Sequence, residues 1–212
     1  APSRPARHAS SGQKSSSLLA KVAAIAPTAA PTIAMTIQNG VDTARFLPAD
    51  SSEAREALGL PIGATVIGTI GRLDPVKDQA GLIEAFSGLA ESGSSPILAI
   101  VGEGPSRPAL EEQIRRRGLS QRVRLFGERR DVATVLRAFD IFVLPSRAEG
   151  MSNTILEAMA TALPVVATDV GGNPELVEPE TTGRHVPPGV PHALQAGLRA
   201  YVARSYLPRP EG

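Results

Sequence analysis

The 212-residue sequence contains no cysteine, which excludes a disulfide framework, thiolate zinc sites, iron–sulfur clusters and a cysteine nucleophile. Its three histidines, His8, His185 and His192, lack the spacing of metal ligands. No Asp-x-Asp pair is present that could hold a divalent metal on a diphosphate. We therefore expect no metal site and no cofactor. Any phosphate bound here would be neutralised by basic side chains and helix N-termini.

The sequence also has little excess charge and no long hydrophobic run. It has 22 Lys and Arg against 21 Asp and Glu, a net charge of +1, so nothing points to nucleic acid as a partner. Its apolar runs, such as residues 140–145 and 163–167, are far shorter than the roughly 20 residues of a membrane-spanning helix. We expect no integral membrane segment, and a cytoplasmic protein is consistent with the absence of cysteine.

Composition divides the chain into three parts. Residues 1–41 contain four basic and no acidic residues and are rich in Ser, Ala and Pro, which is typical of an arm or a linker remnant. Residues 42–203 carry the globular pattern, and we interpret them as one domain. Residues 204–212 end in Pro-Arg-Pro-Glu-Gly and are expected to be a tail.

Short apolar segments alternate with amphipathic ones from residue 65 onward. The segments 65–70, 97–101, 123–126, 141–144 and 164–167 are predicted to be strands, and 79–91, 107–117, 132–139 and 154–161 helices. Such alternation predicts an α/β fold with a doubly wound, Rossmann-like parallel sheet covered on both faces. Glycines follow several strands directly (Gly71, Gly102, Gly104 and Gly127). Ligand crevices of open parallel sheets lie at this edge.

The segment Ser146-Arg-Ala-Glu-Gly-Met-Ser-Asn-Thr-Ile-Leu-Glu157 leaves a predicted strand, turns at Gly150 and enters a helix. Ser152 or Asn153 could cap this helix, and free N–H groups at its start could hold a phosphate. Glu149 precedes the turn. Glu157 lies in an apolar stretch about 6 Å further along the axis, where it could accept from two sugar hydroxyls. The alternative is that both glutamates are ordinary surface residues.

A second candidate segment is Gly71-Arg-Leu-Asp-Pro-Val-Lys-Asp78, directly after the first predicted strand. Arg72 and Lys77 could together clamp a diphosphate. The alternative pairs Arg72 with Asp74 and leaves Lys77 exposed.

Several common catalytic and nucleotide-binding patterns are absent. The chain has no P-loop pattern and no Gly-x-Ser-x-Gly elbow. Gly102-Glu-Gly104 is followed by Pro105 and lacks the third glycine of a dinucleotide fingerprint.

These motifs, in this order, resemble the C-terminal half of the retaining, group 1 glycosyltransferases of the GT-B fold. The resemblance runs over about 150 residues, from Asn39-Gly-Val-Asp42 and Phe46 to Gly171-Gly-Asn-Pro-Glu-Leu176. Its most specific element is the pair Glu149 and Glu157, with seven residues between them. The resemblance implies one half of a GT-B fold that binds a nucleotide-sugar donor, most simply a UDP-sugar, without a metal.

The resemblance also implies roles for individual residues. Arg72 and Lys77 would bind the diphosphate and stabilise the leaving nucleotide, with Gly71 lining the phosphate site. Glu157 would hold the ribose hydroxyls. The transferred sugar and its phosphate would meet Glu149 and the backbone of Gly150, Met151, Ser152 and Asn153, while the backbone of Leu125, Phe126 and Gly127 would meet the base. The resemblance assigns catalysis to Arg72, Lys77 and Glu149.

The sequence departs from this family in one respect, since no acceptor-binding N-terminal domain is recognisable. Three hypotheses follow. The chain is the donor half of a transferase, completed by an acceptor domain in cis or in trans, through which it could also lie at a membrane. Alternatively, it is a stand-alone nucleotide-sugar-binding fragment or split subunit without transfer activity. A third hypothesis, an epimerase or phosphorylase on a related fold, lacks the extra catalytic groups it requires.

Overall fold

The computed structural model describes residues 40–90 and 96–205. Nearly all of the predicted arm, and the tail from residue 206, lie outside the described residues. Val41, at the start of the described part, packs against one of the two hydrophobic cores.

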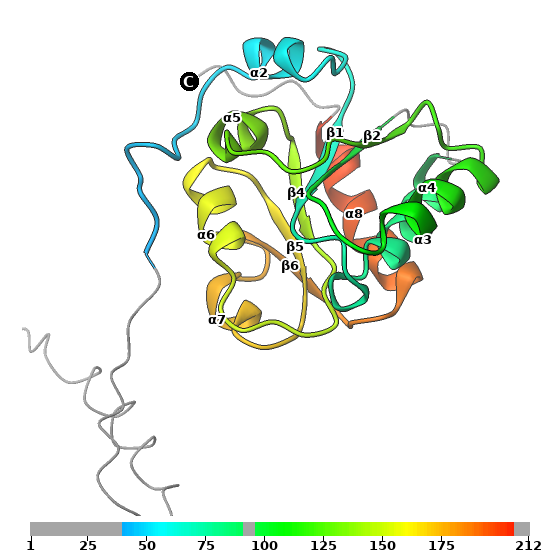
Figure 1. Cartoon of the computed structure of the whole chain (residues 1–212). Helices are drawn as coiled ribbons and strands as arrows, with labels where there is room; N and C mark the ends of the chain where they lie inside the picture. The colour runs from blue at the N-terminus through cyan, green and yellow to red at the C-terminus, as the bar shows by residue number, and fades with distance from the viewer. Residues whose placement is uncertain (1–39, 91–95, 206–212) are drawn as a thin grey trace, which may run out of the picture. The chain divides into compact units, whose positions relative to one another are not determined.

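The described residues form one sheet of six parallel strands (Figure 1). The strands are β1 (Val66–Ile70), β2 (Ile97–Val101), β3 (Val123–Leu125), β4 (Ile141–Leu144), β5 (Val165–Thr168) and β6 (Gly183–Val186). The five predicted strands are confirmed, with ends that shift by at most one residue. The sixth strand, β6, was not predicted. It is an edge strand whose two central residues, Arg184 and His185, are half-buried, so it lacks the continuous apolar run by which the other strands were recognised.

Helices cover both faces of the sheet, as the doubly wound interpretation requires. They are α2 (Ser52–Ala57), the 3-10 helix η2 (Pro75–Lys77), α3 (Gln79–Ala90), α4 (Arg107–Arg116), α5 (Val132–Arg137), α6 (Asn153–Ala160), α7 (Asn173–Leu176) and α8 (Pro191–Ser205). The four predicted helices are present as α3, α4, α5 and α6. The longest helix, α8, was missed, and it extends to Ser205, past the predicted start of the tail. Among residues 191–203, its large buried side chains are Leu194, Leu198 and Val202 at four-residue spacing, among small and polar residues.

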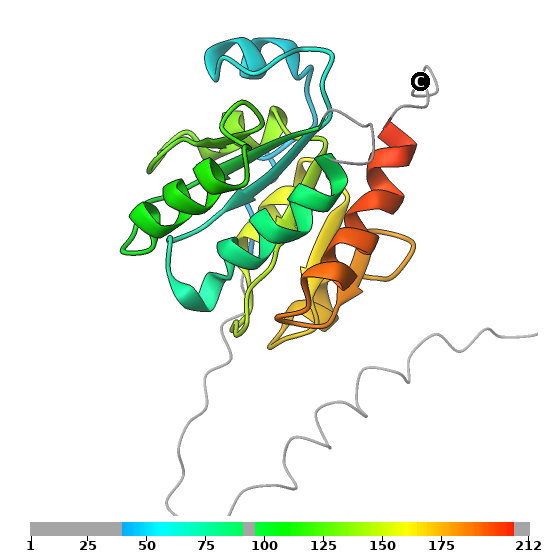
Figure 2. The same ribbon diagram turned by 90° about the vertical axis from the view of Figure 1, so that its right-hand side faces the viewer.

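Two hydrophobic cores, one on each face, hold the layers together. Helix α3 lies between α4 and α8 on one face (Figure 2), and α2, α5, α6 and α7 cover the other face (Figure 1). Neighbouring strand residues alternate between the cores: Leu98 and Ile100 face α3, whereas Ile97, Ala99 and Val101 face the opposite layer. Strands buried on both faces explain why the sequence shows continuous apolar runs rather than alternation.

Strand order decides where a ligand can bind. The order is β3-β2-β1-β4-β5-β6, so the chain reverses direction across the sheet between β1 and β4. Because all the pairs are parallel, the carboxyl ends of all strands lie at the same edge. In open α/β sheets the ligand crevice lies at such a reversal, outside the carboxyl ends of the strands. Both candidate segments, 71–78 and 146–157, follow the two strands that flank it.

Candidate functional site

Backbone hydrogen bonds join the loops at this edge of the sheet. The Arg147 N–H donates to the Val76 carbonyl at 2.7 Å, which ties the loop after β4 to the loop after β1. On the other side, the Leu73 N–H donates to the Glu103 carbonyl at 2.9 Å, which ties the loop after β1 to the loop after β2. The two candidate segments are therefore fixed against each other before any side chain is considered.

Glu149 is the most closely held side chain of the site. Its Oε1 accepts from Lys77 Nζ at 2.5 Å and from the Ser146 hydroxyl at 2.6 Å. The Lys77 and Glu149 side chains are only 28% and 10% exposed. The structure thus brings together two of the three residues to which the resemblance assigns catalysis. The alternative in which Lys77 is simply exposed is wrong, because the chain reversal places Glu149 beside it.

Arg72 lies on the same loop but is largely free of protein partners. Its side chain is 72% exposed, and its Nε lies 4.0 Å from Asp74 Oδ2, at the limit of an ion pair. An exposed pair at this separation contributes about 0–1 kcal/mol. The pairing with Asp74 considered for Arg72 is therefore present but weak. The guanidinium remains available to an anion at the crevice.

The start of α6 directly follows the loop that carries Glu149. Ser152 is the N-cap, and its hydroxyl accepts from the Ile155 N–H at 3.4 Å. Met151 and Asn153 are exposed, and a Cβ placed on Gly150 would meet nothing within 4 Å. Behind this turn, Gly171 has φ +55°, and a Cβ there would lie 2.0 Å from the Glu149 carbonyl. Glycine at 171 thus allows the loop after β5 to support the turn that carries Glu149.

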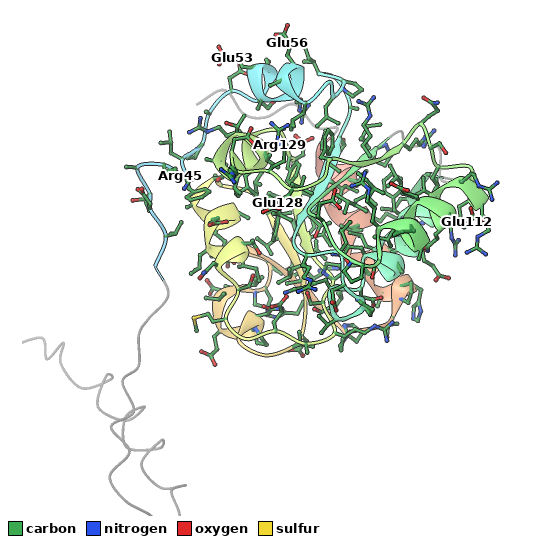
Figure 3. The ribbon with its side chains drawn as sticks, in the orientation of Figure 1. Arg45, Glu53, Glu56, Glu112, Glu128 and Arg129 are labelled. Atoms are coloured by element: carbon green, nitrogen blue, oxygen red, sulfur yellow. The ribbon has the colours of Figure 1, made fainter. Side chains whose placement is uncertain are left out.

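Glu157 lies within α6, four residues after Asn153, and is half-buried. Burial raises the pKa of its carboxyl above the usual range, while the positive charge of Arg45 opposes that shift. Arg45 comes from the segment before α2 and lies beside α5 (Figure 3), where it donates to the Arg130 carbonyl at 3.3 Å. A desolvated carboxylate at this position favours a ligand that donates hydrogen bonds, as ribose hydroxyls do. The half-burial of Glu157 agrees with its place in an apolar stretch, and its contact with ribose hydroxyls stays a prediction.

An open pocket of about 470 Å³ extends from Gly71 and Arg72 toward the ends of β2 and β3. Its wall includes Gly102, Glu103 and Gly104, and also Glu128 and Arg129, which are labelled in Figure 3. Gly104 has φ +159°, and a Cβ there would lie 2.3 Å from the Leu73 carbonyl, so only glycine permits this close approach of the two loops. The pocket has the size and place expected of a nucleoside site.

The predicted base-contacting residues lie next to this pocket rather than in its wall. The side chains of Leu125 and Phe126 pack against the two hydrophobic cores, and the Gly127 carbonyl accepts from the Gly102 N–H at 2.7 Å. All three residues are half-buried. Their role stays a prediction.

Sequence reasoning missed the charged residues around the pocket. Glu103, Glu128 and Arg129 line it, and Arg45 influences Glu157 from a distant segment. Glu128 and Arg129 directly follow Gly127, so the strand-end glycine was a usable signal for them. Nothing in the sequence pointed to Arg45, because its nearness to α6 depends on how the chain wraps around α5.

Neither a metal-ligand cluster nor a membrane-spanning helix is found in the described residues, 40–90 and 96–205. Within them, no group of three or more His, Cys, Asp or Glu side chains is arranged to hold a metal ion. Over the same residues, no helix has both the length and the apolar character needed to cross a bilayer.

The sequence of this chain is similar to one known protein family and to individual proteins. The family described as "Glycosyl transferases group 1" matches residues 64–204. The lipopolysaccharide core biosynthesis mannosyltransferase LpsB of Rhizobium meliloti is 38% identical over 153 residues, which are 66% of this chain and 42% of that protein. A UDP-Gal:alpha-D-GlcNAc-diphosphoundecaprenol alpha-1,3-galactosyltransferase of Escherichia coli is 38% identical over 152 residues, 69% of this chain and 39% of that protein. The chain thus spans about two fifths of the length of these curated relatives.

Solved structures show the same fold. Anabaena Alr3699/HepE in complex with UDP superimposes with a TM-score of 0.73 at 31% identity, over 80% of this chain and 48% of that one. The C-terminal domain of the group 1 family protein LpcC from Francisella tularensis superimposes with a TM-score of 0.64 at 26% identity, over 80% of this chain and 100% of that one. The parallel sheet, the two glutamates on either side of the α6 N-terminus and the match over residues 64–204 lead to one conclusion: the chain belongs to the group 1 glycosyltransferase family and has the fold of one half of a GT-B enzyme.

Proposed function

We propose that this chain is the donor-binding half of a retaining glycosyltransferase, which takes a sugar from a UDP-sugar and works without a metal ion. The single observation that carries the proposal is the Lys77–Glu149 contact at 2.5 Å across the chain reversal. It supports the proposal because an ammonium group suited to phosphate and a carboxylate suited to sugar hydroxyls meet on the two loops that flank the crevice. Arg72 adds a second cation, a largely unpaired guanidinium, on the loop that also carries Lys77.

The chemistry of the departing nucleotide fits these groups. When the bond between the sugar C1 and the β-phosphate oxygen breaks, its electron pair stays with the diphosphate and increases the negative charge there. Arg72, Lys77 and the N–H groups at the start of α6 can receive that charge. The acceptor oxygen forms the new bond to C1 on the face that the diphosphate leaves, and the hydroxyl proton passes to the departing phosphate oxygen. Interactions that strengthen as charge develops lower the barrier more than uniform binding does.

The base and the ribose of the donor would also meet described residues. The pocket next to Gly71 and Arg72 accommodates the nucleoside, and Glu157 accepts from the ribose hydroxyls. Support for uridine comes from Anabaena Alr3699/HepE, whose fold this chain shares and which was solved with UDP and with UDP-glucose.

The acceptor site belongs to the other half of the enzyme. The chain spans 42% of the LpsB mannosyltransferase and 39% of the galactosyltransferase, so the acceptor-binding domain is expected in cis in a longer protein or in trans on another chain. The second candidate function is a nucleotide-sugar-binding fragment or split subunit without transfer activity, which needs only the donor-binding residues described above. Cytoplasm is the expected compartment for either.

Calorimetric titration with UDP, ADP and GDP in EDTA tests the donor site. We expect saturable binding of UDP that weakens at least about tenfold, or about 1.4 kcal/mol, in Glu157→Ala and in Arg72→Ala. Binding that requires added Mg²⁺ would contradict metal independence, and tighter binding of GDP or ADP would replace uridine by another base. A folded chain that binds none of the three nucleotides would reject the donor site.

Transfer and retention need a separate test. The chain joined to an acceptor half should transfer glucose from UDP-glucose, and the chain alone should not. The anomeric proton of the product, observed by ¹H NMR, should show that the α configuration of the donor is kept. A β product would reject retention, and turnover by the chain alone would reject dependence on the acceptor half.

A further inference from the structure

Three polar side chains are fully buried beneath the loop that carries Glu149. Ser146 at the end of β4 and Asn173 at the start of α7 are both 0% exposed, and Thr168 at the end of β5 is 2% exposed. Burying a polar group costs free energy unless the group is hydrogen-bonded. Apolar side chains would fill the same space without this requirement, so the hydrogen bonds of the three residues need an explanation.

The hydrogen bonds form a series that ends on Glu149. Asn173 Nδ2 donates to the Thr168 carbonyl at 3.0 Å. The Thr168 hydroxyl donates to the Ser146 carbonyl at 2.6 Å and lies 3.3 Å from the Leu144 carbonyl. The Ser146 hydroxyl donates to Glu149 Oε1 at 2.6 Å. Three elements separated in sequence are thereby connected to one carboxylate oxygen.

The direction of the last bond is fixed by chemistry. An ionised carboxylate can only accept, so the Ser146 hydroxyl must donate to it. The same oxygen accepts from Lys77. If Lys77 turned toward a phosphate, the bond from Ser146 would still hold the Glu149 oxygen in place.

The backbone of this loop is supported separately. Gly172 N–H donates to the Gly150 carbonyl at 2.9 Å, and Gly171 lies against the Glu149 carbonyl. These contacts hold residues 149 and 150, whereas the Thr168 hydroxyl holds the main chain at Ser146. Thr168 therefore fixes the residue whose hydroxyl bonds the Glu149 carboxylate directly.

We propose that Ser146 and Thr168 are positioning residues that orient the Glu149 carboxylate toward the sugar of the donor. This inference rests on the proposed function, because it assigns Glu149 to the sugar and Lys77 to the diphosphate. Neither hydroxyl touches the donor. Their effect is therefore confined to ligands that carry a sugar.

Calorimetric titration of three variants with UDP and with UDP-glucose tests this inference. Thr168→Val keeps the side-chain shape but lacks the hydroxyl, Thr168→Ser keeps the hydroxyl, and Ser146→Ala removes the direct donor to Glu149. Thr168→Val and Ser146→Ala should leave the Kd for UDP within about twofold and raise the Kd for UDP-glucose about three- to tenfold, the loss of about one hydrogen bond. Thr168→Ser should bind both ligands as the wild-type chain does.

Two results of the Thr168→Val and Ser146→Ala titrations would overturn the inference. One is an equal weakening of UDP and UDP-glucose in Thr168→Val, which indicates a general loss of structure. The other is a ratio of the two Kd values that stays at the wild-type level in both Thr168→Val and Ser146→Ala. A weakened Thr168→Ser variant would likewise show that the hydroxyl is not the relevant group.

A second measurement does not depend on any ligand. In a double-mutant cycle, the unfolding equilibrium constants of Thr168→Val, Glu149→Ala and the double variant should depart from additivity by at least about threefold, as expected for residues in one hydrogen-bond series. Additive effects would overturn the inference. If the wild-type chain bound neither UDP nor UDP-glucose, the proposed function would fail, while this cycle would still decide whether Thr168 acts on Glu149.

Discussion

Lys77 and Glu149 are 72 residues apart in the sequence, yet Lys77 Nζ lies 2.5 Å from Glu149 Oε1. The contact crosses the point where the chain reverses between β1 and β4. Both side chains are more than two thirds buried, so water screens the pair only in part. An anion that binds Lys77 has to compete with Glu149 for the same ammonium group.

This competition predicts that Glu149→Gln affects the binding of UDP and of UDP-glucose differently. Without the carboxylate charge, Lys77 is released from its counterion, and UDP should bind about two- to threefold more tightly, as expected for a partly exposed pair worth below 1 kcal/mol. The ratio of the UDP-glucose Kd to the UDP Kd should rise relative to the wild-type chain, because the amide accepts more weakly from sugar hydroxyls. Calorimetry measures both constants. Glu112→Gln, an exposed carboxylate on α4, is the matched control, and weaker UDP binding by Glu149→Gln would contradict the prediction.

Arg72 should matter for binding and not for stability. Its guanidinium is 72% exposed with only Asp74 at 4.0 Å, so Arg72→Ala should change the free energy of unfolding by no more than about 0.5 kcal/mol. The Kd for UDP should rise at least about tenfold and should rise less steeply with salt than that of the wild-type chain. Arg116→Ala, at a side chain 67% exposed on α4, should leave both quantities unchanged. Equal effects of the two substitutions on UDP binding would remove Arg72 from the site.

The raised pKa of Glu157 predicts a pH-dependent stability. Because burial disfavours its charged form, the folded chain holds this proton at higher pH than the unfolded chain does. Its ionisation therefore lowers the free energy of unfolding as pH rises through the usual glutamate pKa of about 4.3 toward the raised value. Glu157→Gln should be more stable than wild type at pH 7 and equally stable near pH 4 in urea unfolding.

Arg45 provides the control for this titration. Its positive charge opposes the shift, so Arg45→Ala should raise the pKa of Glu157 further. NMR of the Glu157 carboxyl carbon as a function of pH measures this pKa. An unchanged pKa in Arg45→Ala, or a stability gain of Glu157→Gln that persists at pH 4, would contradict the assignment.

Two neighbouring glycines should respond differently to alanine. Gly171 has φ +55°, and its added Cβ would lie 2.0 Å from the Glu149 carbonyl, whereas Gly150 has nothing within 4 Å. Gly171→Ala should lower the free energy of unfolding by about 1–3 kcal/mol, through backbone strain and the collision. Gly150→Ala should lower it by less than about 0.5 kcal/mol. Thermal unfolding compares them, and equal stabilities would show that this loop is not held as described.

A buried ion pair at the amino ends of β1 and β4 should contribute strongly to the free energy of unfolding. Arg55 Nη2 lies 2.6 Å from Asp140 Oδ2, and the two side chains are 5% and 13% exposed. Asp140 also accepts from the Val66 N–H at 2.7 Å. Asp140→Ala leaves a buried guanidinium without its counterion and should cost about 3–5 kcal/mol in urea unfolding. Glu112→Ala, which breaks exposed pairs on α4, should cost below about 1 kcal/mol. Similar costs for both would mean that Asp140 is not the anchor of α2.

Much of the fold could be predicted because each strand buried on both faces leaves an unbroken apolar run in the sequence. Ile97 to Val101 and Ile141 to Leu144 are of this kind. β6 and α8 escaped because each has few apolar residues: in β6, at the edge of the sheet, Val186 is the only large one. In α8 those residues are Leu194, Leu198 and Val202. Their pattern has meaning only once the sheet and α3 are there to receive them.

The candidate site divides in the same way. The sequence by itself determined the local parts: a turn at Gly150 into a helix, two cations after the first strand, and two glutamates placed on either side of that helix start. It left the cap open between Ser152 and Asn153, and the structure has Ser152. Each of these depends on residues within a few positions of one another, where backbone geometry sets the spacing.

Only the tertiary structure decided which of these parts meet. The pairing of Lys77 with Glu149, the approach of Arg45 to Glu157 and the hydrogen bonds from Thr168 to Ser146 all join segments brought together by strand order. Strand order results from the packing of the whole sheet against its two helical layers, and no local stretch of sequence carries that information.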